Sequence, residues 1–185
     1  MILSPTNLNL AYQKVKQNKG ASGVDKMEVE SLSDYLVQHK DRQIESILNG
    51  KYRPDAVRRV EIPKDGGKKR NLGIPTVVDR VIQQAISQEL SKLYEPQFSA
   101  HSFGFRPKRN AHQALIKCKK YIKEGYEYVV DMDLEKFFDT VNHSKLIELL
   151  SRTVKDNRVV SLIHHYLNGG VQIGQSFEPS EKGVP

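Results

Sequence analysis

The chain has 185 residues, of which 38% are hydrophobic and 28% charged, with a formal net charge of +7. No apolar run approaches the roughly 20 residues needed to span a bilayer, and the polar N-terminus does not fit a secretory signal. The one cysteine, Cys118, excludes an intramolecular disulfide. We therefore expect a cytoplasmic protein of one or two domains with no membrane contact.

The N-terminal segment predicts two helices separated by a glycine-containing loop. Ser4 and Pro5 are typical of a helix start, and apolar residues then recur at helical spacing up to Gly20. A second set of apolar residues at helical spacing covers 32–48 and ends at Gly50.

A strongly basic β-hairpin is predicted next. Residues 57–62 alternate in character, 65–68 read Asp-Gly-Gly-Lys, and 71–74 form the returning arm. A helix with one apolar face is expected over 78–94.

The remaining chain predicts more helices, a strand and a short hairpin. After a loop rich in Phe, Gly and Arg, Asn110 should cap a helix that ends at Gly125. The segments that follow are a strand over 126–132, a helix over 145–152, a helix through Tyr166 that Asp156 can cap, and hairpin strands at 171–173 and 176–178. The architecture is therefore expected to be α+β.

The distribution of charge favours a polyanionic partner, although a merely basic domain remains an alternative. Basic residues far outnumber acidic ones between positions 51 and 70. Four aromatic residues lie among the basic clusters and offer flat faces on which bases could stack: Tyr52, Phe98, Phe103 and Phe105.

Two acids, Asp131 and Asp133, stand at the end of the predicted strand 126–132. Residues two apart on a strand face the same side, and two neighbouring carboxylates repel each other unless a cation or hydrogen bonds offset the charge. Mg²⁺ prefers such hard oxygen ligands. Taken alone, such a pair of acids is more often a solvated or salt-bridged strand end than a metal site.

Several segments, in this order, resemble the group II intron reverse transcriptases, also called intron maturases. They are 18–25 (NKGASGVD), 59–75 (RVEIPKDGGKKRNLGIP), 102–112 (SFGFRPKRNAH), 131–143 (DMDLEKFFDTVNH) and 183–185 (GVP). The resemblance implies a right-hand polymerase, with fingers over 1–125 and the first part of a ferredoxin-like palm over 126–185. It also implies that the chain stops before the second catalytic hairpin, whose aspartates would complete a two-metal site.

The resemblance assigns roles to individual residues. Asp133 matches the catalytic, metal-binding aspartate, and Leu134 matches the neighbour whose carbonyl helps to hold the metal, Mg²⁺ or possibly Mn²⁺. Phe138 matches the residue that excludes a 2′-hydroxyl, and Lys64 and Arg70 match the cations that grip the triphosphate. The residues expected to contact RNA are Arg58, Arg59, Arg106, Lys108 and Arg109.

The function implied is RNA-directed DNA synthesis during retrohoming, with assistance to RNA splicing. The partners are then an intron RNA template, a DNA primer or target, and dNTPs. The chain alone is expected to be inactive, and an unpaired palm edge should favour self-association. Two alternatives stay open: a non-catalytic RNA-binding splicing module, and a retron or CRISPR-associated reverse transcriptase.

Overall fold

The computed structural model describes residues 1–63, 67 and 69–184. These residues form two compact units, one of Met1–Ile86 together with Lys136–Pro185 and one of Ser87–Glu135. We call them the first and the second unit and describe each by itself. The predicted boundary between fingers and palm, at residue 125, stays a prediction, because the units are defined by packing alone.

The first unit contains most of the helices, and their ends follow from local signals. Ser4 accepts a hydrogen bond from the Asn7 amide at 3.4 Å, and Asp156 accepts one from the Arg158 amide at 3.0 Å, so both predicted caps are confirmed. The helices of this unit are α1 (Pro5–Asn18), α2 (Leu32–Leu48), α3 (Val77–Tyr94) as far as Ile86, α5 (Phe137–Thr140), α6 (His143–Thr153) and α7 (Asn157–Leu167), with the short 3₁₀ helix η1 (Val29–Ser31) before α2.

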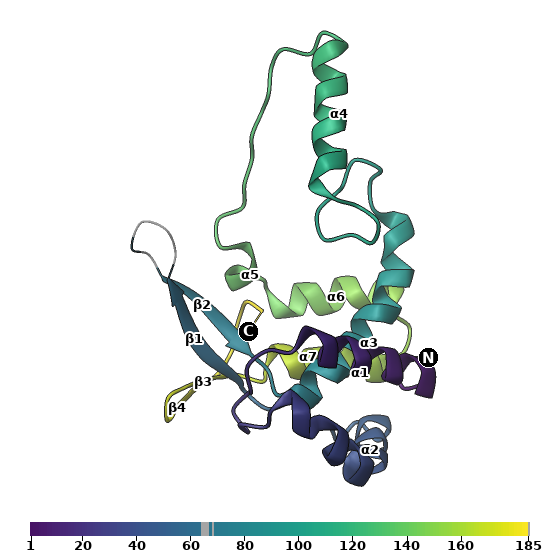
Figure 1. Cartoon of the computed structure of the whole chain (residues 1–185), viewed down its shortest axis with the longest axis vertical. Helices are drawn as coiled ribbons and strands as arrows, with labels where there is room; N and C mark the ends of the chain where they lie inside the picture. Colours follow the sequence, from purple (N-terminus) through teal and green to yellow (C-terminus); the bar gives the residue numbers. More distant parts are fainter. Residues whose placement is uncertain (64–66, 68, 185) are drawn as a thin grey trace. The chain divides into compact units, whose positions relative to one another are not determined.

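A four-stranded sheet in the order β2-β1-β3-β4 lies in the first unit (Figure 1). Its strands are β1 (Val57–Pro63), β2 (Lys69–Ile74), β3 (Val171–Ile173) and β4 (Ser176–Glu178). β1 and β2 are antiparallel, as are β3 and β4, so both predicted hairpins are confirmed. The parallel pairing of β1 with β3 joins them, with Val57 opposite Val171. Lys64 and the turn residues 65, 66 and 68 lie outside the described residues.

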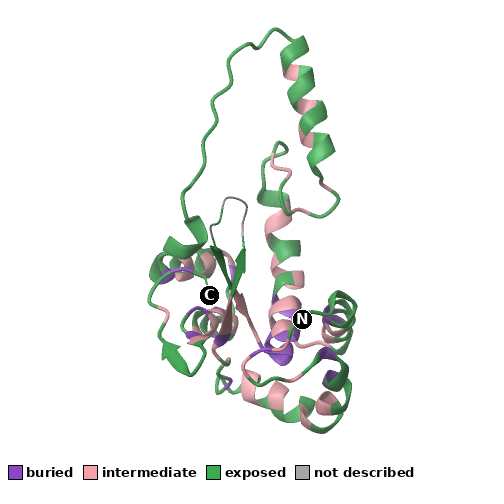
Figure 2. Cartoon of the chain, turned by 60° about the vertical axis from the view of Figure 1, so that its left-hand side comes forward, coloured by how far each residue is buried: buried purple, intermediate pink, exposed green. Residues whose placement is uncertain are grey.

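The hydrophobic core of the described chain belongs entirely to the first unit (Figure 2). Ala11 of α1, Leu32 of α2, and Val77 and Ala85 of α3 have no exposed surface. The predicted helical spacing therefore identifies real packing faces, and α3 is the helix whose first half is most completely buried.

The second unit consists of the end of α3, the 3₁₀ helix η3 (Glu95–Gln97), a loop, α4 (Ala111–Lys123) and the segment after it. Asn110 and Gln113 form a capping box, with 3.0 Å bonds in both directions, which confirms the predicted start of this helix. None of the described helices in either unit is long and apolar enough to cross a membrane.

The predicted strand over 126–132 is wrong. Residues 126–134 have no regular secondary structure and all are exposed, and the segment is not among the strands of the sheet (Figure 2). A β-strand is held by bonds to a neighbouring strand, and no partner for this segment is present in the described part of the chain. The segment 126–132 therefore has the apolar composition of a strand, but the described residues provide no neighbouring strand with which it pairs.

Candidate functional site

The predicted metal ligands lie in the extended segment of the second unit. Asp131 and Asp133 are both exposed, and the Leu134 side chain is 69% exposed. Without a strand, the two carboxylates are not fixed on a common face. The described residues contain no group of three or more His, Cys, Asp or Glu residues that could hold a metal. Asp133 and the Leu134 carbonyl are hard oxygen donors of the kind that suits Mg²⁺, but they form only part of a site.

The predicted sugar-contacting residue, Phe138, lies in the first unit on the one-turn helix α5. Its ring meets the Phe137 ring edge-on, with centroids 5.5 Å apart and planes at 68°. Both rings are largely exposed, at 68% for Phe138 and 50% for Phe137. The backbone of the helix is bound from outside, because the Val184 amide donates to the Phe138 carbonyl at 2.8 Å.

The basic hairpin presents Arg70 on β2, opposite Ile62 of β1 and exposed. This arrangement leaves the Arg70 guanidinium accessible to an anion. Lys64, its predicted partner on the other arm, lies outside the described residues. The binding of a triphosphate by both side chains therefore stays a prediction.

Arg58 and Arg59, both on β1, are engaged within the protein. The Arg58 guanidinium donates to the Ser22 carbonyl at 3.0 and 2.7 Å, and Arg59 lies 3.5 Å from a carboxylate oxygen of Glu178. Arg80 of α3 binds the same N-terminal loop through the carbonyls of Lys19 and Ala21. The segment 18–25 is therefore held by two arginines, and the RNA contacts of Arg58 and Arg59 stay predictions.

In the second unit, Arg106 organises the loop that precedes α4. Its side chain is 8% exposed and lies 2.8 Å from Glu95, and it also donates to the carbonyls of Ser99 at 2.6 Å and Ser102 at 3.0 Å. The hydrogen bonds that Arg106 donates to the Glu95 carboxylate hold the pKa of Glu95 below its usual value. The guanidinium also lies over the Phe98 ring. The hydrogen-bond donors of the Arg106 guanidinium are thus occupied by acceptors within the protein.

Lys108 and Arg109 are more open than Arg106. Lys108 is exposed, and Arg109 is half-buried, stacks over the Phe103 ring at 5.6 Å and donates to the Ala100 carbonyl at 3.3 Å. Phe105 is fully exposed. These side chains are at least partly accessible from solvent, and their contact with RNA stays a prediction.

The base-stacking role predicted for Tyr52 is wrong, because its side chain is buried with 9% exposure. Its hydroxyl donates to Oδ1 of Asp79 at 2.7 Å, and the Tyr166 hydroxyl donates to the same atom at 3.0 Å. The other oxygen, Oδ2, accepts from the Thr76 hydroxyl at 2.7 Å and from the Asp55 amide at 3.3 Å. A carboxylate that is 1% exposed thus joins three segments of the first unit, namely residues 52–55, the start of α3 and α7.

Burial has a clear electrostatic effect on this cluster. It raises the pKa of the Asp79 carboxyl above its ordinary value, although the hydrogen bonds from Thr76 and the two tyrosines act in the opposite direction. Burial and the Asp79 charge raise the pKa of Tyr52 and of Tyr166. One local signal could have identified Asp79: Thr76-Val-Val-Asp79 has the spacing of a helix-capping pair, and the Thr76 hydroxyl accepts from the Asp79 amide at 3.2 Å.

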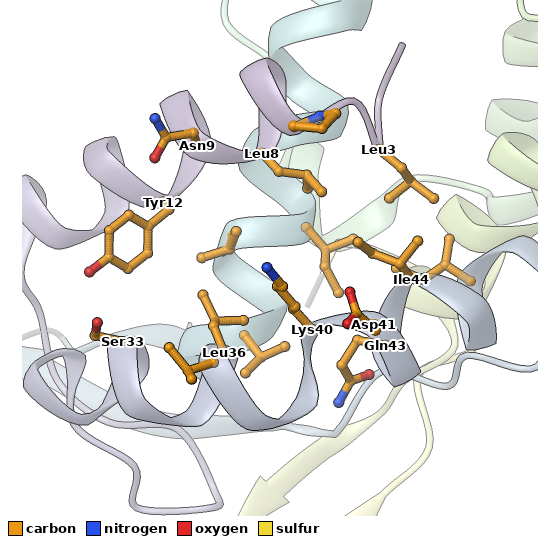
Figure 3. Close-up of a pocket in the computed structure, with 16 residues that line it drawn as sticks. Leu3, Leu8, Asn9, Tyr12, Ser33, Leu36, Lys40, Asp41, Gln43 and Ile44 are labelled. Atoms are coloured by element: carbon orange, nitrogen blue, oxygen red, sulfur yellow. The ribbon is translucent and has the colours of Figure 1, made fainter.

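An apolar pocket of about 500 Å³ opens between α1, α2 and α3 in the first unit (Figure 3). Its wall includes Leu8 of α1, Leu36 and Ile44 of α2, and Ile82 of α3, with Lys40 projecting into it. None of the residues predicted to act on nucleotide or RNA lines this pocket. The candidate site is therefore an open surface and not this cavity.

Comparison with known proteins decides the family. A family model described as reverse transcriptase (RNA-dependent DNA polymerase) matches residues 62–185. The chain belongs to the reverse transcriptase family. The match includes Arg70, the Asp133 segment and the Phe137–Phe138 pair, and this family generally uses divalent metals.

Relatives of the reverse transcriptase chain support a narrower resemblance. It is 36% identical to the group II intron-encoded protein LtrA of Lactococcus lactis subsp. cremoris, over 100% of this chain and 31% of that protein. It is 33% identical to the protein YkfC of Escherichia coli K12, over 100% of this chain and 50% of that protein. The chain therefore spans a third to a half of the length of these relatives. The resemblance to group II intron reverse transcriptases is confirmed.

Solved structures support the fold. A chain of the partial Cas6-RT-Cas1–Cas2 complex superposes with a TM-score of 0.62, covering 100% of this chain and 30% of that one at 19% sequence identity. At this identity the likeness speaks for the fold alone. The reverse-transcriptase fold predicted from the sequence, of α+β class, is confirmed.

Proposed function

We propose that this chain supplies the N-terminal part of the polymerase of a group II intron-encoded RNA-directed DNA polymerase. The proposal is carried by the family match over 62–185, which spans both the basic hairpin and the segment from Asp133 to Phe138. The substrates are dNTPs, an intron RNA template and a DNA primer or target. A role in RNA splicing accords with a further relative, the mitochondrial nuclear intron maturase 2 of Arabidopsis thaliana, 36% identical over 46% of this chain.

Asp133 would hold a divalent cation, Mg²⁺ or Mn²⁺, together with the Leu134 carbonyl. Bound there, the cation lowers the pKa of the attacking primer hydroxyl and neutralises developing phosphate charge. Oxygen donors of this kind fit a hard cation, and further carboxylates are required to complete the site. We therefore expect no polymerase activity from the 185 residues alone.

The exposed segment 126–134 fits a strand that pairs with residues outside this chain. It is apolar in large part, with Tyr128 95%, Val129 85% and Val130 80% exposed. A strand with free backbone groups and an apolar face is completed by a neighbouring strand. In a protein of the length of its relatives, that pairing would fix Asp133; in the chain alone, the same edge would favour self-association.

Arg70, with Lys64, would bind the triphosphate of the incoming nucleotide. Arg70 is exposed on β2, and a guanidinium makes charge-assisted, often paired, hydrogen bonds to phosphate oxygens. Phe138 would lie against the sugar and disfavour a 2′-hydroxyl. Its largely exposed ring is available for such a contact.

The decisive test replaces the proposed ligand in a protein that contains this chain and the additional length of its relatives. Asp133→Ala should reduce RNA-templated DNA synthesis by more than about a thousandfold and leave RNA affinity largely unchanged. Asp131→Ala is the matched control, because Asp131 lies in the same exposed segment, and it should retain most of the activity. Equal losses in both variants would remove Asp133 from the catalytic role.

A second test addresses nucleotide binding. Arg70→Ala should raise the KM for dNTPs about tenfold, whereas Lys69→Ala, whose ammonium is paired with Glu61, should change it little. An unchanged KM in Arg70→Ala would exclude Arg70 from the triphosphate site.

The net charge of +7 favours a second candidate function, RNA binding without catalysis. A wild-type protein that binds intron RNA but makes no DNA would support this alternative. In either case, RNA affinity should fall steeply as salt rises, because phosphate contacts release counterions. The CRISPR-associated alternative has weaker support, since the solved chain of that kind shares 19% identity with this one.

A further inference from the structure

His143 begins helix α6 in the first unit and is buried, with 7% of its surface exposed. Its Nε2 lies 2.7 Å from the carbonyl oxygen of Gly183, and its Nδ1 lies 3.1 Å from the side-chain oxygen Oδ1 of Asn168. A backbone carbonyl can only accept a hydrogen bond, so Nε2 must carry the proton and donate it. The ring therefore holds Gly183 by a short, directed hydrogen bond.

The segment bound by His143 is itself bound to the turn that carries the aromatic pair. The Gly183 amide donates to the Val141 carbonyl at 2.8 Å, and the Val184 amide donates to the Phe138 carbonyl at 2.8 Å. We call Gly183 and Val184 the strap. His143 holds the strap on one side, and the strap holds both ends of the Phe138–Val141 turn on the other.

The strap can approach this closely only because residue 183 is glycine. Its φ is +81°, and a Cβ atom there would lie 2.8 Å from the Asp139 carbonyl oxygen. A side chain would thus be strained in conformation and would also clash with backbone. Close contact between the strap and the turn is built into the sequence at this position.

Phe138 depends on the backbone around it for its position. Helix α5 has four residues, fewer than a helix needs to be stable by itself. The Phe138 ring is 68% exposed, and its ring contact among the described residues is with Phe137. Few side-chain contacts therefore fix the ring, and the hydrogen bond from Val184 to the Phe138 carbonyl ties this residue to a segment outside the turn.

We propose that His143 is a positioning residue for Phe138, acting through the strap, and that it thereby sets selectivity for deoxyribose over ribose. The selectivity part rests on the proposed function, in which Phe138 contacts the sugar. His143 touches no substrate in this scheme. It keeps the strap in place. The strap in turn fixes the position of the Phe138 carbonyl and therefore of the Phe138 ring.

A matched pair of substitutions separates the Gly183 hydrogen bond from the rest of the His143 side chain. The amide nitrogen of glutamine can take the place of imidazole Nε2, whereas the shorter asparagine reaches only the place of Nδ1. His143→Gln should therefore keep the bond to Gly183, and His143→Asn should lose it. Both variants remove the ring, so a difference between them reports on this bond.

The first measurement follows amide hydrogen exchange of Gly183 and Val184 in the 185-residue chain by NMR. We expect exchange at both amides about tenfold faster in His143→Asn than in the wild type, and near the wild-type rate in His143→Gln. Unchanged exchange in His143→Asn would overturn the proposal, because His143 would then not hold the strap.

The second measurement compares kcat/KM for dNTPs and rNTPs in a protein that contains this chain and the additional length of its relatives. His143→Asn should lower the dNTP preference about tenfold, largely through better use of rNTPs, and His143→Gln should restore it. Tyr52→Phe serves as a control for general destabilisation and should leave the preference unchanged. A preference unchanged in His143→Asn, or lowered as much by Tyr52→Phe, would overturn the selectivity role.

The two measurements also separate this proposal from the proposed function. A wild-type protein that makes no DNA on an RNA template would overturn the proposed function and the sugar selectivity together, whereas the exchange rates would still decide whether His143 holds the strap. A wild-type protein that makes DNA but shows the same selectivity in all variants would overturn only the role of His143.

Discussion

The Tyr52 hydroxyl donates a 2.7 Å hydrogen bond to Oδ1 of Asp79, 27 residues further along the chain, and both side chains are buried. The carboxylate also accepts from Tyr166 of α7, which is 87 residues from Asp79. The cluster thus joins the start of α3 to the chain just before β1 and to the helix before β3. Because β1 and β3 pair in parallel, the cluster lies where the sheet is assembled from distant segments.

Tyr52→Phe should destabilise the chain by about 2 kcal/mol, since it removes one hydrogen bond to a buried carboxylate and leaves the ring in place. Urea denaturation of the 185-residue chain would measure the change. Tyr128→Phe is the control, because the Tyr128 side chain is 95% exposed, and its stability should match the wild type. A Tyr52→Phe variant as stable as this control would show that the hydrogen bond contributes nothing net.

The raised pKa of Asp79 predicts a specific pH dependence of stability. Its ordinary value is 3.8, so as the pH rises above that value the unfolded chain loses this proton first, while the folded chain retains it to higher pH. The free energy of unfolding contributed by Asp79 should therefore fall as pH rises through this window and stay lower above it. Asp79→Asn does not titrate. The stability of the wild type relative to Asp79→Asn should decline from acid towards neutral pH, and parallel stability curves would contradict the raised pKa.

The sequence identified those parts of the fold that local signals determine. Ser4, Asn110 and Asp156 were each expected to cap a helix and each does, because a cap depends on residues three or fewer positions away. The two hairpins were likewise predicted by alternation and turn residues within short segments.

What the sequence could not show depends on distant partners. The segment 126–132 has the composition of a strand, but a strand forms only where another strand is available to pair with it. Tyr52 lies among basic residues, and only the fold reveals that Asp79 and Tyr166 enclose its hydroxyl. The same holds for Arg106, whose charge suggested RNA and whose donors are occupied by Glu95 and nearby carbonyls.

Gly23→Ala should be among the most damaging small substitutions in the first unit. A Cβ atom at Gly23 would lie 2.6 Å from the Thr76 Cα and 2.7 Å from its amide nitrogen, and neither backbone atom can move without disturbing the start of α3. We expect a loss of about 3 kcal/mol, measured by thermal or urea unfolding. Gly104→Ala is the control, because its Cβ would meet nothing within 4 Å, and its stability should be unchanged or slightly raised. Equal stability of the two variants would contradict the close approach at Gly23.

Arg106→Lys tests the loop-organising role of Arg106. Lysine keeps the charge but lacks the planar fork that reaches Glu95, Ser99 and Ser102 at once. We expect amide exchange in the loop 99–109 to become about tenfold faster while the salt dependence of RNA binding keeps its slope, since that slope counts charges at phosphates. Arg109→Lys, which gives up one 3.3 Å hydrogen bond to Ala100, should alter loop exchange much less. If Arg106→Lys instead left the loop as protected as in the wild type, the loop would be held by other bonds and Arg106 would not organise it.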